Sequence, residues 1–179
     1  MQFLTMKQYS NKTVKFGFTL IELLVVVAIL GILASVGLGQ FFTAQKRGRD
    51  TQRKESLASI ARALEMYYND HKQYPLSTGG NEGNIVISGE AGMTIINWGE
   101  EFTDKKTTYM KQLPKDPADN AHYFYMSDGT SFKLYAWIEH ENDSCFLPGG
   151  ACKEGGYLGT SCGPTTCNYC LASANTSCD

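Results

Sequence analysis

The stretch of sequence that decides the fold is Lys15-Phe16-Gly17-Phe18-Thr19-Leu20-Ile21-Glu22, which runs directly into the apolar residues 23–30. No charged residue follows Glu22 until Lys46, so 23 residues pass without a charge. A helix rises about 1.5 Å per residue, and about 20 apolar residues therefore cover the roughly 30 Å hydrocarbon core of a bilayer. The stretch predicts a membrane-spanning helix that begins at Phe18.

Glu22 is out of place in such a helix, because it lies one turn inside the apolar run. A carboxylate within a membrane span costs on the order of 2.5–3.5 kcal/mol, and less near the end of the span. We therefore expect Glu22 to have a partner.

Residues 17–22, with the sequence Gly-Phe-Thr-Leu-Ile-Glu, closely resemble the processing site of type IV pilins and type II secretion pseudopilins. The resemblance implies that a prepilin peptidase cuts between Gly17 and Phe18 on the cytoplasmic face, and that Phe18 is then N-methylated. It also implies that Glu22 pairs with the N-terminal amine of a neighbouring subunit during filament assembly. The alternative is an ordinary single-span anchor in which these residues stand together by chance.

Residues 1–17 carry three lysines and no acidic residue, and they are predicted to form a leader peptide that takes no part in the fold. The leader and the span use roughly the first 45 of the 179 residues, which leaves about 130 for one small soluble domain. The net charge is −2, and with no basic excess a nucleic-acid partner is not indicated.

Beyond Lys46 the helix is predicted to continue with one apolar face. The residues of that face recur at helical spacing: Leu57, Ile60, Ala61, Leu64, Tyr67 and Tyr68. The helix should end before Tyr74-Pro75, because the residue before a proline avoids the α region. The basic residues between 46 and 54 are expected to form a solvated collar. Contact with lipid headgroups or with acidic residues of neighbouring subunits is the alternative.

Two hairpins are predicted after the helix. The glycine-rich segment 76–104 contains two short β-favouring pieces, 85–87 and 93–98, which suggest the first. The stronger hairpin joins 123–126 to 132–139 through the turn Ser127-Asp128-Gly129-Thr130. One face of its second strand carries Phe132, Leu134, Ala136 and Ile138, and this face should pack on Leu57, Ile60 and Leu64 of the helix.

These features predict an α+β fold. A long N-terminal α-helix, half membrane-spanning and half amphipathic, packs on a small antiparallel β-sheet and is followed by a disulfide-rich C-terminal tail. The expected boundaries are a leader over 1–17, a transmembrane and filament-core helix over 18–45, a globular domain over 46–144 and a cysteine-rich tail over 145–179.

All six cysteines lie in that tail: Cys145, Cys152, Cys162, Cys167, Cys170 and Cys178. Cysteines confined to one end of a membrane-tethered protein indicate an oxidising, extracytoplasmic compartment, and we predict three intramolecular disulfides. Six cysteines allow 15 pairings, and the spacing does not choose among them. A zinc site on Cys162, Cys167 and Cys170 is the alternative, but the tail contains no histidine. No metal or cofactor is expected.

The tail also bears on the choice between two related functions. The family resemblance implies an acidic, glycine-rich, calcium-binding loop at the end of major pseudopilins, and this tail departs from that pattern. On that ground a pilus subunit is favoured, and a type II secretion pseudopilin is the alternative.

The predicted function is that of a structural subunit of a type IV pilus-like filament, polymerised through its N-terminal helix. The implied partners are identical or related subunits, the prepilin peptidase, indirectly the assembly platform and its ATPase, and the lipid bilayer before assembly. The implied location is the cell membrane, crossed once, with the globular domain outside the cytoplasm, and then an extracellular filament. A membrane-tethered extracellular binding module that does not polymerise is the alternative from a different class.

No enzymatic function is expected. The string Gly159-Thr160-Ser161-Cys162-Gly163 matches a nucleophile elbow, but that motif requires a strand before it and a helix after it. Here it lies among the cysteines. The three histidines, His71, His122 and His140, are scattered along the chain, and His71 is expected to cap the helix C-terminus.

Overall fold

The computed structural model describes residues 17–78, 83–89, 92–140, 152–153, 156–157 and 159–178. The chain divides into two compact units, Met1–Phe41 and Phe42–Asp179. Helix α1, Leu20–His71, begins in the first unit and ends in the second. The prediction of one helix that begins at Phe18 and ends before Tyr74-Pro75 is therefore confirmed, with a start two residues later than expected.

The C-terminus of α1 is closed by a residue in the left-handed region. Lys72 has φ +59°, and its backbone N–H donates to the carbonyl of Tyr68 at 2.7 Å. This geometry is the αL cap, in which a residue with positive φ satisfies one of the last helical carbonyls. Gln73 and Tyr74 then lead the chain into Pro75, where the helix cannot continue.

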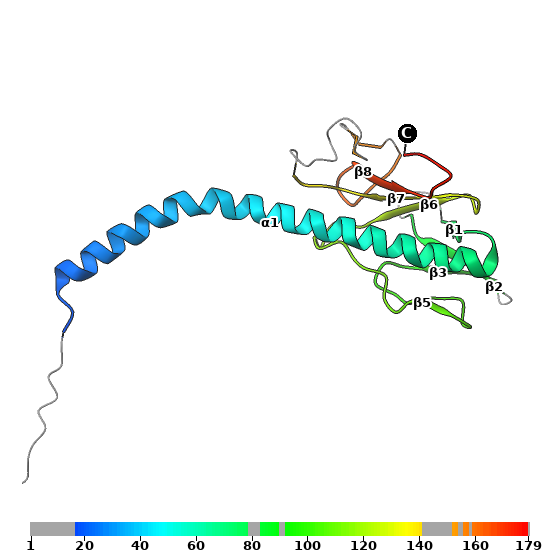
Figure 1. Ribbon diagram of the computed structural model, residues 1–179, viewed down its shortest axis with the longest axis horizontal. Helices are drawn as coiled ribbons and strands as arrows, with labels where there is room; N and C mark the ends of the chain where they lie inside the picture. Colours follow the sequence, from blue (N-terminus) through cyan, green and yellow to red (C-terminus); the bar gives the residue numbers. More distant parts are fainter. Residues whose placement is uncertain are drawn as a thin grey trace, which may run out of the picture. The chain divides into compact units, whose positions relative to one another are not determined.

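The described residues of the second unit form three antiparallel sheets (Figure 1). Strands β1 (Leu76–Ser77), β2 (Ile85–Gly89) and β3 (Gly92–Ile96) form the first sheet. Strands β4 (Phe102–Thr103) and β5 (Thr108–Met110) form the second sheet, which the sequence pattern did not reveal. Strands β6 (Phe124–Ser127), β7 (Phe132–Ala136) and β8 (Tyr169–Ala172) form the third.

Both predicted hairpins are present. In the first, β2 pairs with β3 from Ile85↔Ile96 to Gly89↔Gly92. In the second, β6 pairs with β7 from Phe124↔Tyr135 to Ser127↔Phe132, and Gly129 takes φ +88° in the turn between them. Gly83, with φ +52°, lies so close to β6 that an added Cβ would be 2.7 Å from the Tyr125 backbone nitrogen.

The predicted packing of the helix on the β6–β7 hairpin is confirmed for three of the four residues expected on that face. The fourth, Ile138, is buried but lies beyond the end of β7 and outside this core. Leu57, Ile60 and Leu64 of α1 are fully buried in one core with β7 residues, whose inward side chains are Phe132, Leu134 and Ala136. Aromatic rings fill the rest of this core. Tyr67 of α1, for example, stacks on Phe102 with ring centroids 5.7 Å apart.

Strand β8 extends the third sheet with a segment of the cysteine-rich tail, and no strand was predicted there. It pairs with β7 from Lys133↔Ala172 to Ala136↔Tyr169. The tail also has a small core of its own, made of Cys162, Cys167 and Cys170 with Phe124, Tyr135 and Tyr157. Two aromatic side chains of the sheet, Phe124 and Tyr135, therefore help to bury the cysteines of the tail.

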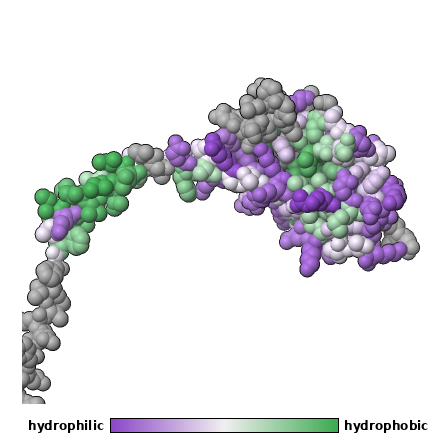
Figure 2. All heavy atoms as spheres, viewed as in Figure 1, coloured by the Kyte–Doolittle hydropathy of each residue, from purple (hydrophilic) through white to green (hydrophobic). Residues whose placement is uncertain are grey.

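The described part of the first unit has an apolar surface, drawn in green in Figure 2. Large apolar side chains from Phe18 to Leu33 are exposed, including Phe18 at 82% and Leu24 at 58%. Among the described residues no single helix is both long and apolar enough to cross a membrane. The segments Leu20–Ser35 and Gly39–His71, bent relative to each other, meet that requirement of length and composition as a pair.

Candidate functional site

The predicted cleavage site lies in exposed, non-helical chain directly before α1. Gly17, Phe18 and Thr19 precede the helix and are all exposed. Nothing lies within 4 Å of the position that a Cβ on Gly17 would occupy. The Gly17–Phe18 peptide bond is therefore sterically accessible to a protease, and the first 16 residues lie outside the described part.

Thr19 and Glu22 form a capping box at the start of α1. The backbone N–H and the hydroxyl of Thr19 donate to Glu22 Oε2 at 2.9 and 2.7 Å, and the Glu22 N–H donates back to Thr19 Oγ1 at 3.3 Å. Such reciprocal bonds satisfy N–H groups that the first helical turn leaves without partners. The expected partner of Glu22 was in another subunit, and the structure shows that it already has one within its own chain.

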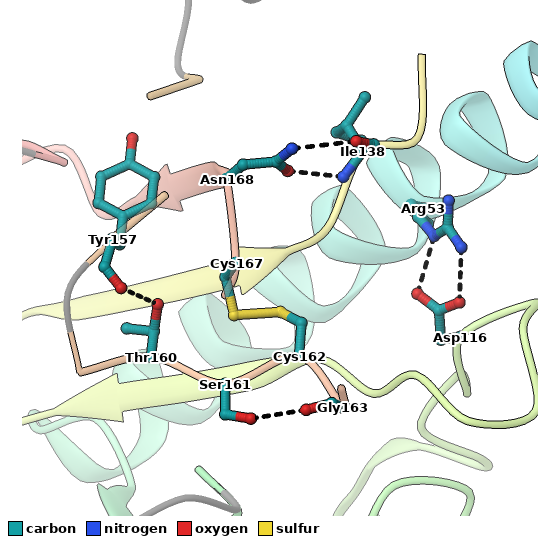
Figure 3. The surroundings of a disulfide bond; sticks show 10 residues. All are labelled: Arg53, Asp116, Ile138, Tyr157, Thr160, Ser161, Cys162, Gly163, Cys167 and Asn168. Carbon is teal, nitrogen blue, oxygen red and sulfur yellow. Dashed lines mark hydrogen bonds and ion pairs between the residues drawn. A yellow bond between two sulfur atoms is a disulfide. The ribbon is translucent and has the colours of Figure 1, made fainter. Parts of the chain in front are cut away.

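A charged cluster, comprising Arg49, Asp50, Arg53, Asp116 and Glu139, joins α1 to the rest of the second unit. Arg53 is fully buried, and its guanidinium binds Asp116 through two hydrogen bonds of 2.8 and 2.9 Å (Figure 3). It also contacts Asp50 and Glu139, each at 2.8 Å. Burial acts to lower the pKa of Arg53, but the hydrogen bonds to Asp116 and its charge raise that pKa on balance, so the side chain remains charged.

Asp50 ties the helix to the chain that follows β7. Its Oδ1 and Oδ2 accept the backbone N–H groups of Glu139 and His140, at 3.0 and 2.9 Å. Arg49 binds Glu139 with two N–H groups, the first at 2.7 Å. The hydrogen bond from Arg49 and the charge of Arg53 lower the pKa of Glu139 to about 2 despite its burial.

The expectation of a solvated basic collar over 46–54 is wrong for much of this segment. Arg53 and Arg49 bind carboxylates of their own chain, and Arg47 Nε donates to His140 Nε2 at 3.2 Å. Lys54 lies 5.6 Å from the ring centroid of Tyr169 in β8. The acids that the alternative placed on neighbouring subunits are supplied from within the chain, by residues far away in sequence.

For two of the predicted disulfides, both cysteines are among the described residues. Cys162 is bonded to Cys167 and Cys170 to Cys178, with Cα–Cα distances of 5.1 and 5.9 Å. Cys152 is also disulfide-bonded, and Cys145 lies outside the described residues. Cys162, Cys167 and Cys170 were the ligands of the alternative zinc site. Because each of their sulfurs is bonded in a disulfide, that alternative does not hold.

The tail also does not fit the calcium loop that the resemblance implies. Its described residues between 152 and 178 include no aspartate or glutamate. In the described part of the chain, no group of three or more His, Cys, Asp or Glu side chains could hold a metal ion. Calcium prefers several carboxylate and carbonyl oxygens. These residues do not provide that donor set.

The remaining polar residues are placed as follows. Ser161 Oγ donates to the carbonyl of Gly163 at 2.9 Å. Ser161 lies in an isolated β-bridge with Thr166, and not in the strand-to-helix turn that a nucleophile elbow requires. His71 does not cap the helix as expected. Its Nε2 lies 2.8 Å from Asp104 Oδ2 and 3.2 Å from the Tyr109 hydroxyl, so it joins the helix end to the β4–β5 hairpin.

Comparison with known proteins gives two matching families. A family model described as the prokaryotic N-terminal methylation motif matches residues 13–38, which include Gly17, Phe18 and Glu22. A model described as type II secretion system protein G matches residues 40–138, from α1 to the end of β7 and the two residues beyond it. No solved structure matches the chain.

The relatives agree with the longer match. The chain is similar to the type II secretion system core protein G of Pseudomonas aeruginosa, with 38% identity over 122 residues, 67% of this chain and 80% of the relative. The corresponding protein of Vibrio cholerae is 34% identical over 124 residues, 69% of this chain and 77% of the relative. A type IV major pilin of Myxococcus xanthus is 38% identical over 58 residues only, 32% of this chain and 26% of the relative.

The methylation motif, which indicates processing by a prepilin peptidase, and the long N-terminal helix define a pilin-like protein. Within that class, the chain belongs to the type II secretion system protein G family. The comparisons therefore support the pseudopilin alternative better than the pilus subunit that the sequence favoured. That preference depended on the tail, and the family match ends at Ile138, before the tail begins.

Proposed function

We propose that this chain is a pseudopilin of a type II secretion system. The observation that carries the proposal is the match to protein G over residues 40–138, joined to a methylation motif that includes Gly17, Phe18 and Glu22. Membership of this family implies a membrane-anchored subunit that assembles with related subunits into a filament. The chain itself is proposed to have no enzymatic activity.

The proposed pathway begins in the membrane. The apolar N-terminal half of α1 crosses the bilayer once, with the second unit outside the cytoplasm. A prepilin peptidase then cuts between Gly17 and Phe18, and Phe18 is N-methylated. The exposed bond before α1 supports this step, because a protease needs extended and accessible chain.

Assembly follows from the surface of the first unit. Its exposed side chains from Phe18 to Leu33 form an apolar surface far larger than soluble monomers tolerate, so lipid or neighbouring helices must cover it. Gly31, Ser35 and Gly39 recur every four residues, a spacing that lets helices approach closely. An assembly platform and its ATPase are the proposed machinery that extracts the subunits from the membrane.

Glu22 is proposed to guide this assembly. Thr19 donates both of its hydrogen bonds to Oε2, and within the described residues Oε1 accepts none. The carboxylate can therefore keep its cap and accept the Phe18 amine of a neighbouring subunit at Oε1. Such an ion pair would set the axial register between subunits.

Gene deletion separates secretion from pilus function. In the organism that encodes this chain, its loss should cause proteins normally released to the medium to accumulate at least tenfold in the cell envelope, with surface pili unchanged. Plasmid-borne wild-type chain should restore release, and a variant with Gly17 replaced by a bulky residue should not, because its leader remains attached. Normal release together with loss of surface pili would show a pilus subunit instead.

A further inference from the structure

The described disulfides of the tail join cysteines that are neighbours in sequence order. Cys162 and Cys167 are 5 residues apart, and Cys170 and Cys178 are 8 residues apart. The two loops do not overlap. Neither pair therefore has to wait for a distant part of the chain to arrive.

The folded subunit hides most of these sulfurs from any enzyme. Cys162, Cys167 and Cys170 are fully buried, beneath Phe124, Tyr135 and Tyr157. The backbone closes around them too, since the N–H of Tyr157 donates to the carbonyl of Cys167 at 2.8 Å. At Gly156 an added Cβ would come within 2.8 Å of that carbonyl oxygen. Thiol oxidation must therefore occur before the tail packs against the sheet.

Oxidation also has a structural consequence for β8. Cys170 lies within this strand, opposite Tyr135 of β7. Asn168, just before the strand, exchanges two hydrogen bonds with the backbone of Ile138, at 2.6 and 3.0 Å (Figure 3). Ordering a glycine-rich segment has a large entropic cost, which a closed loop lowers by restricting the unfolded chain. The disulfides thus favour the addition of β8 to the sheet.

We propose that this chain is a substrate of a thiol oxidase that acts on the tail as it emerges from the membrane, and that its described disulfides need no isomerase. The inference rests on the proposed function, which places the second unit outside the cytoplasm. A cysteine thiolate attacks the disulfide of the oxidase and forms a mixed disulfide. The second cysteine thiolate then displaces the oxidase. Two S–H bonds become one S–S bond, and the oxidase leaves as a dithiol that carries the two electrons.

Consecutive pairing is the product that such an oxidase should give. A loop of about 10 residues closes in roughly 10–100 ns, and the entropic cost of closure rises with loop length. Loop length alone would pair Cys167 with Cys170, which is only 3 residues away. The order of emergence decides instead, because the mixed disulfide at Cys162 is resolved by Cys167, the next cysteine to appear, and Cys170 is then left for Cys178. Non-consecutive partners, which would need an isomerase to reach, do not occur among the two pairs that the structure defines.

The test uses the full chain produced in three strains of a two-membrane bacterium: intact, without the periplasmic thiol oxidase, and without the disulfide isomerase. Free thiols are alkylated in the cells, and peptide mass mapping identifies the bonded pairs. The intact and isomerase-deficient strains should give Cys162–Cys167 and Cys170–Cys178 in equal yield. The oxidase-deficient strain should give at least tenfold less of both. Equal yield without the oxidase, or scrambled pairs without the isomerase, would overturn the inference.

A matched variant tests whether each loop closes independently. Cys170→Ala combined with Cys178→Ala removes one pair, and Cys162–Cys167 should still form to the same extent in the intact strain. Loss of that remaining pair would contradict local closure. Because the readout is bond formation, the result does not require the variant to complete its fold.

The same samples separate this inference from the proposed function. Membrane fractionation and N-terminal sequencing show whether the chain was inserted and cut before Phe18. A processed chain whose disulfides form without the oxidase overturns only the inference. A chain that is not processed and keeps reduced cysteines in all three strains overturns the proposed function as well.

Discussion

Thr19 and Glu22 hold each other through three hydrogen bonds at the first turn of α1, so the carboxylate that looks isolated in the sequence has a partner in its own chain. A capping box uses only local residues and forms before any neighbouring subunit arrives. The subunit can therefore wait in the membrane with this charge partly satisfied. In the proposed assembly, the amine of a neighbouring subunit binds the oxygen of Glu22 that Thr19 leaves open.

Substitutions of Glu22 should distinguish the role of its capping hydrogen bonds from the role of its negative charge. Glu22→Gln keeps an acceptor for Thr19 but removes the negative charge, and Glu22→Leu removes both. We expect both variants to be inserted and cut before Phe18 yet to give at least tenfold fewer filaments, because an amine buried without its counter-ion costs about 3–5 kcal/mol. Glu22→Asp should be intermediate, since the charge remains but the side chain is shorter. Sheared-filament yield measures the effect, and wild-type yield from Glu22→Gln would assign Glu22 to the cap alone.

Loss of Asp116 should destabilise the second unit strongly. Asp116→Ala removes the two hydrogen bonds that hold the buried Arg53 guanidinium. Removal of one partner from a buried ion pair costs about 3–5 kcal/mol. The measurement is urea unfolding of the full chain in detergent. Arg62→Ala is the control, because Arg62 is exposed and should change the free energy of unfolding by no more than about 0.5 kcal/mol. Equal effects of the two variants would show that the buried pair adds nothing.

Acid should weaken the link between α1 and the chain after β7. Glu139 has a pKa lowered from 4.5 to about 2, chiefly by the hydrogen bond from Arg49. A lowered pKa means that the unfolded state binds the proton first, so this contribution to stability is complete above pH 4.5 and is lost as the pH falls toward 2. Unfolding free energies should therefore fall across this window for the wild type. Glu139→Gln should flatten that part of the profile, and an unchanged slope would contradict the assignment.

Lys72 offers a stabilising substitution. It has φ +59°, in a region that costs an L-residue with a Cβ roughly 1–2 kcal/mol and glycine little. Lys72→Gly should raise the free energy of unfolding by about 0.5–1 kcal/mol, because the gain exceeds the loss of an exposed bond from Lys72 Nζ to the Asn69 carbonyl. Lys72→Ala loses that bond and keeps the strain, so it should not stabilise. Thermal unfolding of the three proteins makes the comparison, and equal midpoints for Gly and Ala would refute the strain.

The sequence predicted the elements whose signal is local. The uncharged run after Glu22 and the spacing of Leu57, Ile60 and Leu64 are enough to predict α1, and a glycine turn between alternating apolar residues is enough to predict β6 and β7. In the candidate site, the segment from Gly17 to Glu22 could be named from the motif. The capping box could also have been read there, because Thr19-x-x-Glu22 has the required spacing.

The charged cluster could not be predicted, because the residues that α1 contributes are distant in sequence from Asp116 and Glu139. Arg53 is 63 residues from Asp116, and Asp50 is 90 residues from His140. The many basic residues between 46 and 54 suggest a solvated collar when the sequence is taken alone. Only the fold brings the carboxylates of Asp116 and Glu139 next to them. Strand β8 was missed for a related reason. Its segment, Tyr169–Ala172, is too short for a clear alternating pattern, and it becomes a strand because β7 offers an edge beside it.

The two hydrogen bonds between Asn168 and Ile138 connect the cysteine-rich tail to the chain that follows β7. The amide of one side chain imitates a backbone peptide there, and it binds the last residue of the segment that the secretion family shares. The described residues beyond Ile138 contact the rest of the second unit through the β7–β8 pairing, the loop at 120–122 and side chains of the helix such as Asp50. The family match ends where these contacts begin, and the β2–β3 and β6–β7 hairpins make their own pairing without the tail. A different tail could therefore follow Ile138 without any change to the pairing of the two hairpins.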